Sequence, residues 1–341
     1  MCFVYAQQKT LGIILEQREK IIPEERAPER RVIIVSGPTA VGKSAIGIRL
    51  AKALGGEVVS ADSMQVYRGM DLGTAKVMPF EMEEINHHLI DIRDITEPFH
   101  VVDFYHEARM ACMSILSRNR VPIIVGGSGF YLHALLYGPP EGPPSDPAIR
   151  KKLEDKLEMF GADALYAELE QVDPLYAETI TCHDKHKIVR ALEIIHLGGV
   201  KVSDLKWKQH KPSREFDFRC WFLHRPRSSL YSRIDHRCDK MLEQGFLEEV
   251  VSLDKQGLRQ NTSASQAIGY RQALEFLQTS QTRADYKKFV EDFKTASRHY
   301  VKKQFTWFRQ EKLFHWLDLD LHDVETAVDI IISDYENARG G

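Results

Sequence analysis

The hydrophobic and polar positions of the chain alternate between short apolar runs and longer stretches with helical spacing. Residues 32–35 form a β-branched run that ends at Gly37 and Pro38, which predicts a buried strand entering a turn. Residues 45–54 have helical spacing and stop at Gly55 and Gly56, a typical C-terminal signal of a helix. The first part of the chain therefore predicts a strand, a turn and a helix in succession.

Further apolar runs predict strands at residues 57–60, at 121–125 before Gly126 and Gly127, and at 218–223. We expect helices from there to the C-terminus. Strands that alternate with helices favour a parallel sheet with helices on both faces.

A cluster of proline and glycine at residues 138–144 indicates a domain boundary. Residues 146 to about 202 read as helical and charged, with Pro147 at a first-turn position, and the basic stretch 206–214 reads as a return linker. We expect a helical insertion domain at 146–212 between two parts of the core, 31–145 and 213–341. The charged residues before them form an N-terminal extension, 1–30, to which we assign no function.

The composition is typical of a soluble globular protein, with 341 residues, 43% hydrophobic and 28% charged. Its 5 cysteines are scattered without a Cys-x-x-Cys pair, which gives neither a disulfide framework nor a zinc site and suits a reducing cytoplasm. No stretch approaches the roughly 20 apolar residues that span a bilayer, and the first residues do not resemble a signal peptide. We therefore expect a cytoplasmic protein with no membrane partner.

The chain is mildly acidic, with 46 Lys and Arg against 49 Asp and Glu, so any surface for nucleic acid must be a local patch. Read as a helix, residues 289–307 have one predicted core stripe and, opposite it, a basic face. Phe305 and Phe308 lie at the edge of this basic face. The core stripe consists of Phe289, Phe293, Ala296, Tyr300 and Trp307, and the basic face of Lys287, Lys294, Arg298, Lys302, Arg309 and Lys312. Such a face is usually only solvated, but in an acidic chain we expect it to contact phosphates, chiefly through Arg298, Lys302 and Arg309.

The strongest motif matches G-x-x-x-x-G-K-[ST] between the first strand and the first helix. It reads Gly37-Pro38-Thr39-Ala40-Val41-Gly42-Lys43-Ser44. In this context the glycines let backbone N–H groups surround phosphate oxygens, and the helix start adds a favourable dipole. Lys43 would reach the terminal phosphate and Ser44 would ligate Mg²⁺. The fold class expected is therefore α/β, a P-loop NTPase-like parallel sheet with helices on both faces and a helical insertion.

An acidic residue, Asp62, follows the second predicted strand. A lone aspartate there more often caps a helix or a turn. Because the carboxyl ends of parallel strands open onto one crevice, however, Asp62 should face the bound phosphates.

A family resemblance rests on several short motifs in a fixed order, which cover nearly everything from about Arg31 to Leu317. Besides the phosphate loop they are Asp62-Ser63-Met64-Gln65-Val66-Tyr67, Gly73-Thr74-Ala75-Lys76, His87-His88-Leu89-Ile90-Asp91, Gly126-Gly127-Ser128, Gly269-Tyr270-Arg271 and Lys303-Gln304-Phe305-Thr306-Trp307-Phe308-Arg309. In these the chain resembles the bacterial-type tRNA dimethylallyltransferases. The N-terminal extension has no counterpart in the usual pattern of that family.

The resemblance implies transfer of a dimethylallyl group from dimethylallyl diphosphate to N6 of the adenosine directly 3′ of the anticodon, in tRNAs that read codons beginning with U. It implies that residues 37–44 bind the diphosphate, with Mg²⁺ as cofactor. Asp62 corresponds to the general base, Arg237 to an arginine on the diphosphate, and Ser128 to a threonine that contacts the adenosine. A monomer is implied as well.

Contacts with the tRNA anticodon stem-loop are also carried over from the resemblance. They fall on Asp62, Ser63, Met64, Gln65, Ser128, Arg150, His186, Lys187, Ile188, Val189, Arg190, Gln266, Ala267, Ile268, Gly269, Tyr270 and Arg271. Arg150, Lys187, Arg190 and Arg271 have the chemistry that phosphates and base edges require.

Other functions remain open on the residues alone. An adenylate isopentenyltransferase, which alkylates free AMP, ADP or ATP, would share the core chemistry, but the insertion and the basic face would then be superfluous. A small-molecule kinase is permitted by the phosphate loop and would turn over ATP. A non-catalytic RNA-binding protein would have no reason to keep Lys43, Ser44 and Asp62 together.

Overall fold

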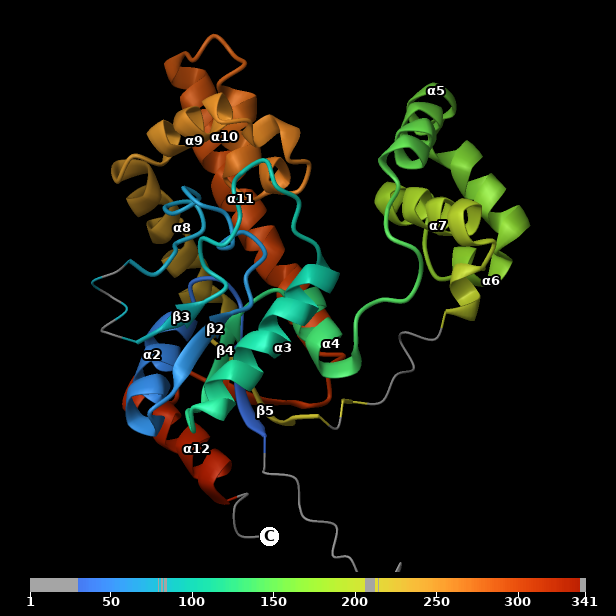
Figure 1. The fold of residues 1–341 in the computed structure, drawn as a ribbon. Helices are drawn as coiled ribbons and strands as arrows, with labels where there is room; N and C mark the ends of the chain where they lie inside the picture. The colour runs from blue at the N-terminus through green and yellow to red at the C-terminus, as the bar shows by residue number, and fades with distance from the viewer. Residues whose placement is uncertain are drawn as a thin grey trace, which may run out of the picture.

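The computed structural model describes residues 30–337 except 79, 81, 83, 84, 206–211 and 214. The expected extension, 1–30, apart from Arg30, and most of the expected return linker therefore lie outside the described residues. The described chain forms a 6-stranded sheet of order β3-β2-β4-β1-β5-β6, in which every neighbouring pair is parallel (Figure 1). The strands are β1 (Arg31–Ser36), β2 (Glu57–Ser60), β3 (His87–His88), β4 (Pro122–Gly126), β5 (Asp217–His224) and β6 (Phe314–Asp318).

The strand order places helices on both faces of the sheet, as expected. The crossover from β1 to β2 runs in one direction along the sheet and that from β3 to β4 in the other, so right-handed connections put α2 (Lys43–Leu54) and α3 (Val101–Ser117) on opposite faces. Helix α12 (Val324–Asn337) packs beside α2, and α4 (Gly129–Tyr137) packs beside α3.

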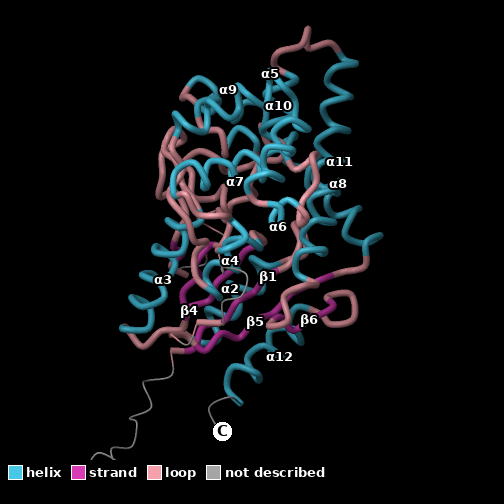
Figure 2. Tube along the Cα trace, turned by 90° about the vertical axis from the view of Figure 1, so that its right-hand side faces the viewer, coloured by secondary structure: helices cyan, strands magenta, loops and turns pink. Residues whose placement is uncertain are grey.

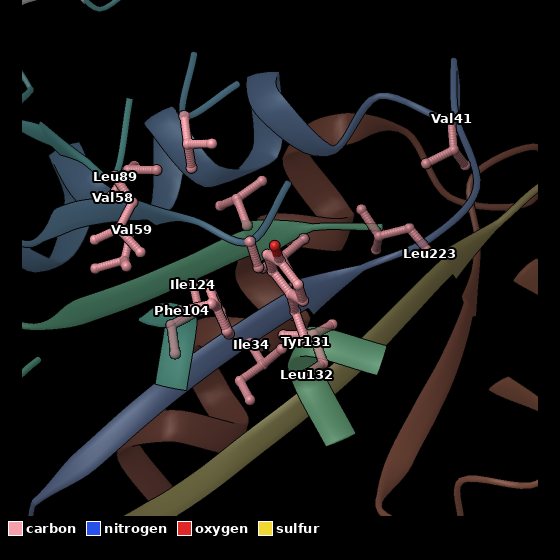
Figure 3. Packing of buried hydrophobic residues seen from close by; sticks show 14 of the residues in the cluster. Ile34, Val41, Val58, Val59, Leu89, Phe104, Ile124, Tyr131, Leu132 and Leu223 are labelled. Atoms are coloured by element: carbon pink, nitrogen blue, oxygen red, sulfur yellow. The ribbon is translucent and has the colours of Figure 1, made fainter. Parts of the chain in front are cut away.

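The core lies where these helices meet the central strands. Ile34 of β1 pairs in register with Ile124 of β4, and both are fully buried. Figure 3 shows Phe104 of α3 and Tyr131 and Leu132 of α4 packed against this part of the sheet, and the Phe104 and Tyr131 rings stack at 4.4 Å between centroids. Burial on both faces explains why β1, β2 and β4 read as continuous apolar runs.

Two strands were not predicted. β3 is 2 residues long, too short for a period to be seen, and it pairs only with β2. The expectation that helices alone follow β5 is wrong, because the 5-residue β6 pairs with β5 as the edge of the sheet. Trp316 of β6 is exposed, so β6 lacks the continuous apolar pattern of a central strand.

A group of helices stands above the carboxyl edge of the sheet (Figures 1 and 2). Its members are α8 (Arg227–Glu243), α9 (Phe246–Lys255), α10 (Tyr270–Phe276) and the long α11 (Arg283–Phe308), with 3₁₀ turns η3 (Leu258–Gln260) and η4 (Ala264–Gln266). Glu249 of α9 accepts hydrogen bonds from the backbone N–H groups of Asp71, Leu72 and Gly73, at 3.1, 2.7 and 3.2 Å. These bonds fix the loop that follows β2 against the helices.

Apart from the helices above the sheet stand α5 (Pro147–Val172), α6 (Pro174–Ala177) and α7 (Lys185–Gly198), with 3₁₀ turn η1 (Val202–Asp204) (Figure 1). They have a hydrophobic cluster of their own. Leu165, Leu169 and Ile188 are fully buried in it. We propose that this cluster is the core of the insertion domain expected at 146–212. In the described part of the chain, no helix is both long and apolar enough to cross a membrane.

A buried carboxylate fastens the first residue of β2 to the neighbouring elements. The Glu57 side chain is 1% exposed and contacts Arg118, Arg120 and His88 at 2.8, 3.1 and 2.7 Å. Burial opposes its ionisation, but hydrogen bonds from these side chains outweigh burial and lower the Glu57 pKa from 4.5 to about 2.

We predict that Glu57→Gln destabilises the fold in a pH-dependent way. Because the folded pKa lies below the unfolded value, ionised Glu57 stabilises the protein above pH 4.5, and this contribution is lost as the pH falls towards 2. Urea unfolding should show the variant less stable by roughly 2–3 kcal/mol at pH 7, with the difference shrinking at pH 3. The exposed Glu158→Gln serves as control, and a difference that is constant with pH would contradict the prediction.

Candidate active site

The loop between β1 and α2 is shaped to hold an anion. Gly37 has φ +153°, and a Cβ there would lie 2.5 Å from the carbonyl oxygen of Leu223 on β5. Gly42, at the helix N-cap, has φ +115°, no side chain bonds to the first amides of α2, and the first turn holds no acidic residue. The amides at the start of α2 are therefore available to phosphate oxygens.

Lys43 lies in this loop with its amine turned toward the loop backbone. Its Nζ donates to the carbonyl oxygens of Gly37 and Pro38, each at 2.9 Å. Burial and the charge of Arg237 lower the Lys43 pKa to about 7, although Asp62 opposes the shift. The next residue, Ser44, is exposed in the first turn of α2.

The phosphate loop is tied to β4 by Gln304 of α11. The buried side-chain amide donates from Nε2 to the carbonyl oxygen of Gly127 at 3.0 Å and accepts at Oε1 from the backbone N–H of Thr39 at 3.1 Å. A Cβ at Gly127 would lie 2.4 Å from Gln304 Nε2, so only glycine permits this approach. In the sequence, Gln304 stands within the motif of residues 303–309, and no role was predicted for it.

Two cavities open beside the loop. The first, of about 110 Å³, lies against the phosphate loop and is lined by Lys43, Ser44 and Gln65 among others. The second, of about 360 Å³, is more apolar and is lined by side chains that include Met64, Ile268 and Phe293. The residues common to both linings are Thr39, Asp62, Thr74, Arg237 and Tyr300, which we call the waist.

The predicted base and the predicted diphosphate arginine meet at the waist. Asp62 follows β2, and its Oδ1 accepts the backbone N–H of Met64 at 2.9 Å. Arg237 of α8 donates from Nη2 to the carbonyl oxygen of Thr74 at 3.4 Å. Burial lowers the Arg237 pKa, and the nearby Asp62 charge opposes that shift. Arg237 and Lys43 therefore make the site cationic around a single neighbouring carboxylate.

Ser128 lies beside this pair, at the N-cap of α4. Its Oγ accepts the backbone N–H of Ser63 at 3.3 Å and lies next to the Tyr300 hydroxyl. Tyr300 was assigned to the core stripe of its helix, which is wrong, because it lines both cavities. Its spacing from Gln304, four residues along α11, places both side chains on the face toward the phosphate loop and could have identified it.

The basic face predicted for α11 is wrong for its middle residues. Lys294 pairs with Asp239 at 2.6 Å and Arg298 with Asp235 at 2.8 Å, both on α8, so these cations point at a neighbouring helix. Arg298 also binds Glu291 at 2.7 Å, which leaves its guanidinium engaged within the protein. Phe305 and Phe308 are buried rather than at an exposed edge. Lys302 and Arg309 are exposed, as expected.

The predicted tRNA contacts near the second cavity differ in how far their side chains are exposed. Gln266, Ala267 and Ile268 line it together with Ser63 and Met64. Gly269 is buried. Tyr270 also lines this cavity, but it is fully buried from solvent and its hydroxyl donates to Glu249 at 2.6 Å. Arg271 is exposed at the start of α10.

The contacts predicted on the helical cluster line neither cavity. The side chains of Ile188 and Val189 are buried in its core, so neither can meet RNA. Arg190 binds the buried Glu193 at 2.7 Å, and Arg150 lies 3.7 Å from the same carboxylate. His186 and Lys187 are exposed.

The described residues contain no group of three or more His, Cys, Asp or Glu side chains placed to hold a metal ion. The loop offers the Ser44 hydroxyl instead. Magnesium commonly takes few protein ligands together with water and substrate phosphate oxygens, so this donor set fits Mg²⁺ that arrives with a diphosphate.

Known proteins are similar to this chain over most of its length. Residues 65–311 match the family model described as IPP transferase. The tRNA dimethylallyltransferase of Protochlamydia amoebophila is 59% identical over 326 residues, which are 96% of this chain and 95% of that protein. That of Chlamydia pneumoniae is 53% identical over 290 residues, 85% of each chain.

Solved structures are similar along most of the chain. The tRNA isopentenylpyrophosphate transferase of Bacillus halodurans is 35% identical with a TM-score of 0.66, over 91% of this chain and 98% of that one. A eukaryotic dimethylallyltransferase described as acting on tRNA is 30% identical with a TM-score of 0.74, over 90% of this chain and 80% of that one. The chain therefore belongs to the IPP transferase family, whose members here are tRNA dimethylallyltransferases.

Proposed function

We propose that the chain transfers the dimethylallyl group of dimethylallyl diphosphate to N6 of the adenosine directly 3′ of the anticodon, in tRNAs that read codons beginning with U. The observation that supports this proposal is that the residues of the waist line both cavities. A carboxylate, Asp62, lines both a small cavity beside a phosphate loop and a larger apolar cavity. Two substrates bound in the two cavities would meet at this carboxylate.

The first cavity suits the diphosphate. The amides at the start of α2, Lys43 and Arg237 supply hydrogen-bond donors and positive charge where the leaving oxygens gain negative charge. When bound, Mg²⁺ would lie near Ser44 and neutralise part of that charge. Lys43 would exchange its bonds to the loop carbonyls for bonds to phosphate oxygens.

The second cavity suits an unstacked purine. An adenine cannot be alkylated at N6 while it is paired in a helix, so it must be flipped into a pocket. Met64, Ile268 and Phe293 offer apolar contact to its faces, and Ser128 lies next to the waist. Gln266, Arg271, Lys302 and Arg309 lie at exposed positions from which they could bind the surrounding RNA.

The reaction exchanges one carbon bond for another. The C1–O bond of dimethylallyl diphosphate breaks and its electron pair leaves with the diphosphate, while the N6 lone pair forms the new N–C bond. Alkylation makes the N6 proton acidic, and Asp62 takes it. The products are N6-dimethylallyladenosine in tRNA, diphosphate and one proton.

The helical cluster α5–α7 supports tRNA rather than a free nucleotide as the acceptor. It carries basic residues that line neither cavity, of which His186 and Lys187 are exposed, and a free AMP bound in the cavities could not contact them. We propose that this cluster binds the anticodon stem-loop through Arg150, His186, Lys187 and Arg190. We propose also that the protein acts in the cytoplasm as a monomer. Incubation with dimethylallyl diphosphate, Mg²⁺ and either unmodified tRNA or AMP, followed by mass analysis of nucleosides, tests the choice of acceptor.

We predict that Asp62→Asn removes the base without removing the substrates' binding sites. The single-turnover rate of transfer should fall by about 10²–10⁴-fold, while the Kd for tRNA changes little. Asp94→Asn, at an exposed aspartate that pairs with Arg68 on the surface, serves as control. A rate for Asp62→Asn close to that of the wild type would remove Asp62 from the mechanism.

We predict further that diphosphate binding takes up a proton at Lys43. Because the Lys43 pKa in the free protein is about 7, the amine is largely neutral at pH 8.5, and an anion bound beside it favours the charged form. Affinity for inorganic pyrophosphate should therefore fall as the pH rises above 7. Calorimetry in buffers of different ionisation enthalpy measures the protons taken up.

Lys43→Arg provides the comparison, because its guanidinium stays charged and the protonation of pyrophosphate itself is common to both proteins. At pH 8.5 the wild type should take up roughly one more proton than the variant, and at pH 6 the two should be alike. Equal uptake at pH 8.5 would show that Lys43 is already protonated before binding.

A further inference from the structure

Tyr300 is the one aromatic side chain among the residues that line both cavities. The others, Thr39, Asp62, Thr74 and Arg237, are polar or charged. If the diphosphate lies in the first cavity and the purine in the second, the carbon that changes partner lies at the waist. Tyr300 is therefore placed beside the reacting carbon, whereas Phe293 lines the second cavity alone.

The positive charge near the waist would oppose the formation of an allylic cation there, and the ring of Tyr300 could offset this effect. As the C1–O bond breaks, positive charge develops on the allylic carbons. Lys43 and Arg237, which stabilise the diphosphate, repel that positive charge, and the lone neighbouring carboxylate is engaged in accepting the N6 proton. The face of an aromatic ring attracts a cation through its quadrupole without carrying a charge of its own, so it does not repel the diphosphate.

The ring of Tyr300 is held in place and kept neutral. Its hydroxyl lies next to Ser128, whose Oγ accepts the backbone N–H of Ser63. Burial and the charge of Asp62 raise the Tyr300 pKa above its ordinary value of 10, so the phenol does not ionise at neutral pH. A fixed and uncharged ring can act in the transition state without reorganising.

From these observations we propose that Tyr300 is a catalytic residue whose aromatic face stabilises the developing allylic cation. This proposal rests on the function proposed above. It assigns to Tyr300 a role in breaking the C1–O bond, distinct from proton transfer to Asp62 and from binding of the diphosphate.

The test compares ring with hydroxyl. Tyr300→Phe keeps the ring and removes the hydroxyl, whereas Tyr300→Leu removes the ring and stays apolar. With saturating tRNA and dimethylallyl diphosphate, the single-turnover rate should fall roughly 30-fold for Leu, the scale of a desolvated cation–π contact, and only a few-fold for Phe. Affinity for inorganic pyrophosphate should change little in either. Tyr286→Leu, at an exposed tyrosine of the same helix, should leave the rate unchanged.

A graded series separates stabilisation of a cation from packing. Phenylalanines bearing one, two and three ring fluorines, introduced at position 300, have nearly the same shape but progressively weaker negative faces. The logarithm of the rate should fall steadily along the series. A rate independent of fluorination, or a loss in Tyr300→Phe as large as in Tyr300→Leu, would overturn the proposal and leave Tyr300 as a support for Ser128.

The outcome is separable from that of the proposed function. If the wild-type protein fails to alkylate tRNA with dimethylallyl diphosphate, the function itself is wrong. If the wild type is active and the fluorinated series is flat, only the role of Tyr300 is wrong.

Discussion

The proposed active site depends on placing two partly buried cations and one carboxylate around a common waist. Lys43 and Arg237 are each destabilised by burial, which lowers both pKa values, and Asp62 partly offsets that cost. Such a cluster binds an anion strongly because the anion restores charge balance. The same positive charge opposes any cation formed nearby, which is why a neutral aromatic ring beside Asp62 has a purpose in this site.

The scaffold fixes these charges through the ends of parallel strands. The phosphate loop follows β1, Asp62 follows β2 and Ser128 follows β4, so neighbouring strands deliver them to one edge of the sheet. Helix α11 then crosses above this edge and supplies Gln304 and Tyr300. Glu249 holds the loop after β2 in the position at which the Thr74 carbonyl can orient Arg237. The chemistry is thus assembled from elements distant in sequence, each anchored by buried hydrogen bonds.

The helical cluster α5–α7 is stabilised separately from the sheet, since its hydrophobic residues pack with one another. Arg150 and Arg190 both lie at the buried Glu193, close to the point where the chain enters α5. Glu193 accepts the Ser145 hydroxyl and the backbone N–H of Asp146, so it fastens the start of α5 to α7. These hydrogen bonds fix the position of residues 145 and 146, which lead into α5, relative to α7.

The sequence alone determined the parts of the protein that depend on local spacing. The buried strands β1, β2, β4 and β5 were predicted because burial on both faces produces continuous apolar runs, and the phosphate loop because its glycines are required by backbone geometry. The placement of Asp62 at the crevice followed from the rule for the ends of parallel strands. All of these properties are carried by residues close together in the chain.

Only the tertiary structure decided which face of a helix is buried and against what. On α11 a basic face was expected to contact phosphates, but Lys294 and Arg298 pair with aspartates of α8. Tyr300 was expected in the core and instead lines the two cavities. Ile188, Val189 and Tyr270 were expected as tRNA contacts from the family resemblance, yet their side chains are buried from solvent. Helical periodicity gives the direction of each side chain relative to its own axis, whereas the partner on the other side is set by packing between elements far apart in sequence.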